Sequence, residues 1–174
     1  MWCVAKVVAL LLIGLLAAAS PAWAAQRLGT PSIEQLTRTA DVVAIGEVGS
    51  AAGEWAAGRA SIQTRVVLTA VELLKGTEPS PLTFTHLGGQ VGDEASAIGG
   101  GLQFQPGERV LVFLSRRPDG SLRMVDLTYG RFEIVRDAAT GRNLAFPATG
   151  ATGADRIDLD QLRMLVRRAL GGTD

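Results

Sequence analysis

His86 is the only histidine of this 174-residue chain, and the only cysteine, Cys3, lies near the start of the sequence. Nucleophilic catalysis needs a serine, threonine or cysteine beside a base, so His86 would have to be that base. A triad of His86 with Asp93 or Glu94 and a serine such as Ser96 can be drawn, but only composition supports it. The sequence contains no G-x-S-x-G nucleophile elbow. We therefore predict no catalytic residue, and we interpret His86 as a strand histidine at a barrel mouth.

Metal ions find few ligands in this sequence. With one histidine and one cysteine, zinc lacks a set of imidazole and thiolate ligands. Asp93 and Glu94 lie in a glycine-rich segment and offer oxygen atoms for calcium, but the D-x-D-x-D-G pattern of calcium loops is missing. Two adjacent carboxylates are more typical of a solvated loop. We therefore predict neither a metal ion nor another cofactor.

Two segments carry residues suited to binding rather than catalysis. Residues 51–59 form a Gly- and Ala-rich stretch with Trp55, which either anchors a ligand or folds over the open end of a barrel. Residues 88–101 hold six glycines, which allow either close backbone approach or simple mobility. We expect both segments to be loops. The candidate binding residues are Trp55, His86, Gly88, Gly89, Asp93 and Glu94.

The first 24 residues have the layout of a secretory signal. One positive charge, Lys6, precedes an apolar run over residues 7–19, and Ala22 and Ala24 supply the small residues that a signal peptidase recognises. The apolar run is 13 residues long, whereas a membrane-spanning helix needs about 20. We therefore expect cleavage after Ala24 and export to the periplasm or the medium, with no stable membrane span.

Cleavage would leave 150 residues, 25–174, the size of one ordinary domain. The 16 basic and 17 acidic residues of this segment nearly balance. This argues against nucleic acid as a partner, because nucleic-acid-binding proteins present a basic face. The segment has no cysteine, so we predict a fold without disulfides.

Short strands dominate this segment. Alternating or β-branched residues predict strands over residues 41–48, 61–74, 82–87, 110–114, 122–127, 131–135 and 144–146. Gly46, and a slipped alternation within 61–74, indicate bulges where strands bend. The five consecutive apolar residues of 110–114 predict a strand that is buried on both faces.

Helices are expected only at the two ends of the segment. Near the N-terminus, either Thr30 with Pro31 or Ser32 with Gln35 can begin a short helix. Near the C-terminus, Asp158 caps a helix with an apolar stripe, which packs across the barrel mouth or lies on an anionic membrane surface. Strands between terminal helices predict a mainly β protein, a small antiparallel OB-like barrel, with a β-sandwich as the alternative.

Three motifs carry a resemblance to a known family. ADVV at residues 40–43 begins a strand, LLKG at 73–76 ends a long one, and PGER at 106–109 leads into the apolar run. In this order they resemble the netrin-like modules, the OB-barrel family that includes the tissue inhibitors of metalloproteinases. The chain is also similar to a group of uncharacterised exported bacterial proteins. The resemblance covers residues 40–137 and implies a binding or modulating module.

One departure from that family matters for mechanism. The inhibitors place a mature N-terminal cysteine on the zinc ion of their target, whereas this chain would begin with Ala25 and Gln26 after cleavage. The inhibitory mechanism is therefore not carried over to any residue.

Taken together, these patterns predict an exported, non-enzymatic binding module whose partner is a protein or peptide, with protease modulation as one form of that role. A structural component of the envelope is an alternative, which predicts abundance and self-association. A hydrolase of unrecognised type is another, which predicts that His86→Ala abolishes an activity while the fold remains intact.

Overall fold

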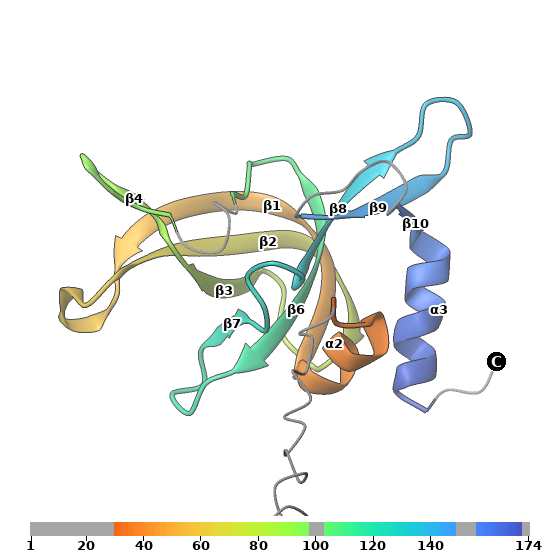
Figure 1. Ribbon diagram of the computed structural model, residues 1–174, viewed down its shortest axis with the longest axis horizontal. Coiled ribbons are helices and arrows are strands. Elements are labelled where there is room, and N and C mark those ends of the chain that lie inside the picture. Colours follow the sequence, from red (N-terminus) through yellow and green to blue (C-terminus); the bar gives the residue numbers. More distant parts are fainter. Residues whose placement is uncertain (1–29, 98–102, 149–155, 172–174) are drawn as a thin grey trace, which may run out of the picture.

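The computed structural model describes residues 30–97, 103–148 and 156–171 (Figure 1). The predicted signal sequence, residues 1–24, and the last glycines of the segment 88–101 lie outside the described residues. Two α-helices are described, α2 (Ile33–Thr39) and α3 (Leu159–Ala169). The strands are β1 (Val42–Trp55), β2 (Ile62–Lys75), β3 (Leu82–Leu87), β4 (Gly89–Val91), β5 (Glu94–Ser96), β6 (Arg109–Arg116), β7 (Leu122–Met124), β8 (Arg131–Arg136), β9 (Asn143–Pro147) and β10 (Ile157–Asp158).

Five of these strands close into a barrel. Their order is β1-β2-β3-β7-β6, and β6 pairs back onto β1, where Val42 lies opposite Leu114 and Glu47 opposite Arg109. The pairings are antiparallel except between β3 and β7, which run parallel at Thr85. Closure of the sheet excludes the sandwich and confirms the predicted small OB-like barrel with a short N-terminal and a C-terminal helix.

The barrel curves where β1 and β2 depart from regular pairing. The register between them shifts at three places, one of which skips Gly46. A Cβ atom at Gly46 would lie 3.1 Å from both the Leu68 Cβ and the Thr69 carbonyl oxygen, so glycine lets β2 pass closely. Ala70 on β2 has φ of 48°, which marks the slip in its alternation. The bulges predicted from the sequence are confirmed.

Two hydrophobic cores share the same strands. The inner core fills the barrel with alternate residues, among them Val66, Leu68, Phe84, Phe104 and Val112. The outer core lies between the barrel wall and the helices and contains Val43, Ile45, Leu111, Phe113, Phe132 and Leu162. Strand β6 serves both cores, and Val110 to Leu114 are all buried. This confirms the prediction of a strand buried on both faces.

Helix α2 begins at Ser32, the second of the two predicted starts. The Ser32 hydroxyl accepts a hydrogen bond from the backbone N–H of Gln35, and the Gln35 side chain accepts one from the N–H of Ser32. At the other end of the helix, the Nζ of Lys75 donates to the carbonyl oxygens of Thr37 (2.9 Å) and Ala40. The lysine of the LLKG motif therefore ties the end of β2 to α2.

Helix α3 is capped by the Asp158 carboxylate, as predicted, but its position differs from expectation. Its apolar residues Leu159, Leu162 and Val166 join the outer core, so α3 lies against the wall of the barrel and not across its mouth. Arg163 forms a bidentate ion pair with Glu72 of β2, in which its Nη2 lies 2.6 Å from Oε2 of the carboxylate. Among the described residues, none of the helices has the length and apolar character needed to cross a membrane.

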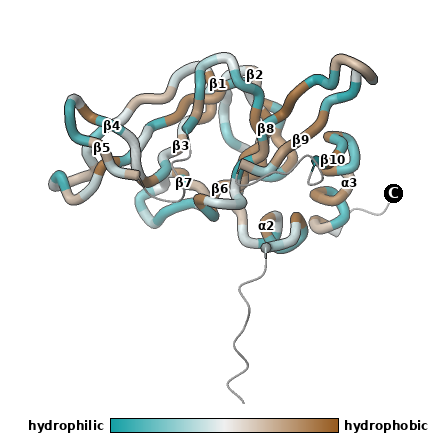
Figure 2. The backbone as a smooth tube through the Cα atoms, turned by 45° about the horizontal axis from the view of Figure 1, so that its top comes forward, coloured by the Kyte–Doolittle hydropathy of each residue, from teal (hydrophilic) through white to brown (hydrophobic). Residues whose placement is uncertain are grey.

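Two segments that we expected to be loops contain strands. Strand β1 continues through residues 51–55 to Trp55, because β2 pairs with it as far as Ile62 and supplies hydrogen-bond partners to its Gly- and Ala-rich half. The turn is confined to residues 56–61. Within 88–101, β4 and β5 pair as a hairpin, with Gly89 opposite Ser96. Figures 1 and 2 place this hairpin at the opposite end of the molecule from α3.

Candidate binding site at the barrel mouth

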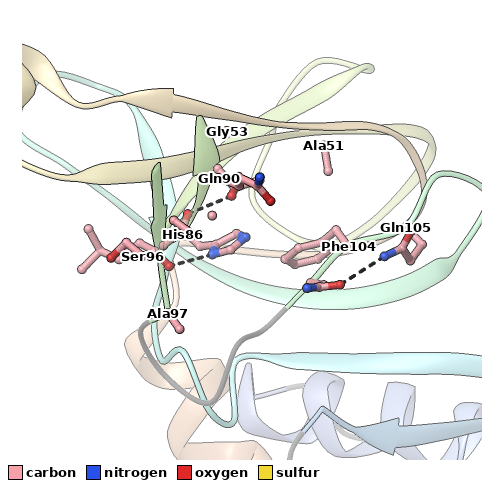
Figure 3. Close-up of a pocket in the computed structure, with 14 residues that line it drawn as sticks. Ala51, Gly53, His86, Gln90, Ser96, Ala97, Phe104 and Gln105 are labelled. Atoms are coloured by element: carbon pink, nitrogen blue, oxygen red, sulfur yellow. Dashed lines mark hydrogen bonds between the residues drawn. The ribbon is translucent and has the colours of Figure 1, made fainter. Parts of the chain in front are cut away.

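A hollow of about 370 Å³ opens at the end of the barrel beside the β4–β5 hairpin (Figure 3). Its walls are the inner faces of three strands, represented by Gly53 of β1, Thr64 of β2 and His86 of β3. The hairpin contributes Gln90 and Ser96, among others. The volume lies within the range of about 300–1,000 Å³ that is typical of small-ligand sites.

His86 is the most unusual side chain of the hollow. Its Nδ1 lies 3.0 Å from the Leu87 carbonyl oxygen, which can only accept, so Nδ1 carries the proton and donates it. The other nitrogen, Nε2, is buried and has no hydrogen-bond partner, although the residue is only 5% exposed. In Figure 3 this nitrogen lies on the side of the ring toward Phe104. A residue that lines the hollow therefore carries a buried acceptor with no donor beside it.

The charge state of His86 follows from its surroundings. Burial lowers the pKa of the imidazole below its usual value, and the positive charge of Arg131 lowers it further. The hydrogen bond to Leu87 acts in the opposite direction and is outweighed. At neutral pH the ring is therefore uncharged, with Nε2 available as an acceptor.

Phe104 forms the aromatic floor of the hollow. Its ring centroid lies 5.5 Å from that of Phe84, edge to face, and 5.3 Å from that of His86 at 40°. The guanidinium carbon of Arg131 lies 4.9 Å from the same ring, and Arg131 forms an ion pair of 2.7 Å with Glu108. Phe104 thus contacts two side chains of β3 and the buried cation at the start of β8 through one ring.

Two glycines bring the hairpin onto the barrel. A Cβ atom at Gly53 would lie 1.9 Å from the Gln90 carbonyl oxygen, and one at Gly89 would lie 2.3 Å from the Thr64 hydroxyl. That hydroxyl donates to the carbonyl oxygen of Gly88 at 2.8 Å. Of the two readings open for the glycines, close backbone approach is therefore confirmed for Gly89.

Trp55 lies beside the hollow and does not line it. It is partly buried at the end of β1, where the guanidinium carbon of Arg59 lies 4.5 Å from the centre of its ring. The Nη2 of Arg59 also lies 3.8 Å from the Glu94 carboxylate, so Arg59 contacts both Trp55 and Glu94. Because both partners of this ion pair are largely exposed, the pair adds little to stability.

The structure brings together some of the predicted binding residues and separates others. His86, Gly88 and Gly89 line the hollow, whereas Trp55 and Glu94 are joined through Arg59 next to it. Asp93 lies exposed in the turn between β4 and β5. Within the part of the chain that the structure describes, no three histidine, cysteine or acidic side chains converge on a point that could hold a metal ion.

Sequence reasoning missed Phe104, Gly53 and Arg131. Phe104 is the one aromatic residue between the glycine-rich segment and β6, and this was the available signal. Gly53 and Arg131 gave no signal, because a glycine in an Ala-rich stretch and an arginine at a strand start are both ordinary. Their roles depend on partners 37 and 23 residues away, Gln90 and Glu108.

Comparison of the chain with family models, curated proteins and solved structures finds no match. The likeness to netrin-like modules therefore stays a prediction drawn from three sequence motifs.

Proposed function

We propose that this protein is an exported, non-enzymatic binding module that holds a protein or peptide partner at the mouth of its barrel. The observation that carries the proposal is the Nε2 atom of His86, a buried acceptor without a partner on a residue that lines an open hollow. An unpaired buried polar atom costs free energy, about 1–3 kcal/mol. A partner that supplies a donor would recover this cost.

The place of the hollow in the fold supports the same proposal. OB barrels commonly bind their ligands on the face formed by their second and third strands and the adjoining loops. Thr64 of β2 and His86 of β3 line the hollow. Gly53, which also lines the hollow, lies two residues before Trp55 on β1, and the Trp55 ring is covered by Arg59.

The contacts of His86 favour binding over hydrolysis. In a catalytic triad, the nitrogen that faces away from the nucleophile donates to a carboxylate. In His86 this nitrogen donates to a backbone carbonyl instead, and the nearby Glu94 is paired with Arg59. These contacts hold a neutral ring in place, which suits an acceptor.

Export is the second part of the proposal and rests on residues 1–24. N-terminal sequencing of the protein recovered from its host tests it, with Ala25 as the expected first residue. A chain that begins upstream of Ala25 would contradict export by cleavage at this site.

Affinity capture tests the binding function. The purified protein is immobilised and exposed to envelope and secreted fractions of its host, beside His86→Phe, Trp55→Ala and the control Val135→Ala, whose side chain is exposed on β8. We expect a partner that the wild type and the control retain and His86→Phe loses. A partner retained equally by all four proteins would contradict a site at the mouth. Self-association without a partner would favour a structural component of the envelope.

A further inference from the structure

We infer that the hollow receives an uncharged aromatic side chain that carries a hydrogen-bond donor, of the tyrosine or tryptophan type. This inference rests on the proposed function, because it names the group that a protein or peptide partner would insert. Three properties of the hollow lead to it: the uncharged residues described in its lining, the buried unpartnered acceptor of His86 and the aromatic floor.

The residues described in the lining of the hollow carry no formal charge. Fourteen residues of the described ranges line it, and none of these is an aspartate, glutamate, lysine or arginine. The buried Arg131 pairs through Nη2 with the partly buried Glu108 at 2.7 Å, its Nε has no hydrogen-bond partner, and neither residue is among those that line the hollow. A charged guest would lose its hydration without gaining a counter-ion, which is costly. The guest is therefore uncharged.

The acceptor fixes the polarity of the guest. Because Nδ1 of His86 donates to the Leu87 carbonyl, the neutral ring presents Nε2 only as an acceptor. Nε2 is unpartnered and covered by protein, so a guest whose donor pairs with it displaces part of that cover and satisfies a buried acceptor. The guest therefore brings an O–H or N–H group.

The rings of the hollow fix the shape of the guest. Phe104 and His86 lie 5.3 Å apart at an angle of 40°, and Phe84 meets Phe104 edge to face. Aromatic rings gain from such tilted and edge-to-face neighbours beyond the burial of their area. Tyrosine and tryptophan side chains combine a flat apolar body with one polar tip. That combination matches an aromatic floor beside one acceptor.

Small analogues of these side chains test the inference directly. 4-Methylphenol has the shape and the O–H donor of a tyrosine side chain, and 4-methylanisole has the same ring with the donor blocked by a methyl group. Because His86 is the only histidine, a protein labelled with ¹⁵N at histidine and free of a histidine tag gives one Nε2 signal. We expect 4-methylphenol to shift this signal and to bind about tenfold more tightly than 4-methylanisole, as one neutral hydrogen bond predicts.

Two variants show whether the preference depends on His86. His86→Phe keeps a ring against Phe104 but removes the acceptor, so we expect the two ligands to bind it equally. His86→Gln keeps an acceptor, so part of the preference should remain if the ring itself is dispensable. Binding to the variants is followed by calorimetry, with circular dichroism as the check that each variant is folded. The comparison of the two ligands on the wild type decides the matter even if a variant fails to fold.

Each opposing result has a definite meaning. Equal affinity for 4-methylphenol and 4-methylanisole, or no binding of either, would overturn the inference. Tighter binding of 4-methylbenzoate would overturn the uncharged guest, and binding of N-acetylglucosamine alone would replace the aromatic guest with a saccharide. Capture of a partner through His86 without binding of 4-methylphenol would refute this inference and leave the proposed function standing. Binding of 4-methylphenol without any captured partner would support this inference about the hollow and contradict the proposed function.

Discussion

The imidazole ring of His86 lies against the ring of Phe104, with 5.3 Å between the ring centroids and 40° between the ring planes. The two residues come from β3 and from the segment before β6, and they meet only because the barrel closes through β7 and β6. Phe104 belongs to the inner core, whereas the free nitrogen of His86 belongs to the hollow. The core and the candidate binding site therefore share this contact.

Phe104→Ala should lower the free energy of unfolding by about 3–5 kcal/mol, the usual cost of removing a buried phenylalanine ring. The ring is 5% exposed and contacts Phe84, His86 and Arg131. Urea denaturation measures the loss. Val135→Ala, on a residue that is 43% exposed, should change stability by less than about 0.5 kcal/mol. A loss from Phe104→Ala as small as that of this control would show that Phe104 is not part of the core.

Acidification should destabilise the protein through His86. Its pKa in the fold is lowered by burial, so below about pH 6.5 the unfolded chain binds a proton that the folded chain does not. As the pH is lowered further, the free energy of unfolding decreases by at most about 1.4 kcal/mol per pH unit, until the pKa of His86 in the fold is reached. Above about pH 6.5 the ring is neutral in both states and adds no pH dependence.

Urea denaturation at pH 7.5 and pH 5.5 measures this effect. The wild type should lose more stability between the two values than His86→Phe, which has no group that titrates at this position. An equal loss in both proteins would mean that the pKa of His86 is not lowered in the fold. Titration of the single histidine by NMR checks the direction of the shift independently.

Gly53→Ala should displace the β4–β5 hairpin. The new methyl group would lie 1.9 Å from the Gln90 carbonyl oxygen, a backbone atom that moves only with the hairpin. We expect a loss of about 1–3 kcal/mol, the usual range for overpacking, and amide chemical-shift changes that spread over β4 and β5. Ala52→Ser, at the exposed neighbouring position of β1, is the matched control. Unchanged hairpin shifts in Gly53→Ala would contradict the close approach.

Lys75→Met should loosen the contact between β2 and α2. The Lys75 ammonium donates to the carbonyl oxygens of Thr37 and Ala40, and methionine keeps the apolar stem but leaves both without this partner. Hydrogen bonds to charged groups contribute about 1.5–3 kcal/mol, so a loss of that order is expected by thermal denaturation. Hydrogen exchange should rise first in α2. Protection of α2 equal to that of the wild type would show that the lysine contacts are dispensable.

Local patterns in the sequence predicted most of the strands, both helices and the barrel. The alternation of Leu82, Phe84 and His86 placed these side chains on one face of β3, and in the structure all three are buried. The glycine within β1 and the slipped alternation of β2 predicted the bulges, because each of these signals depends on only a few adjacent residues. The capping residues Ser32 and Asp158 gave the starts of the two helices for the same reason.

The candidate site depended on contacts between distant segments. Its predicted members His86, Gly88 and Gly89 lie in the hollow, but the sequence did not show that residues 51–55 continue β1 or that Gly89 pairs as a strand. Both errors have one cause. Glycine and alanine have weak preferences of their own, so the partner strand decided their conformation.

The sequence by itself determined a mainly β chain with capped terminal helices and a central strand, β6, that is buried on both faces. Those features follow from the order of neighbouring residues. Only the tertiary structure decided that Phe104, His86 and Arg131 share one ring stack, and that a free imidazole nitrogen lies beside it. The physical reason is that packing and hydrogen-bond satisfaction are properties of pairs, and these pairs lie 18 to 45 residues apart in the chain.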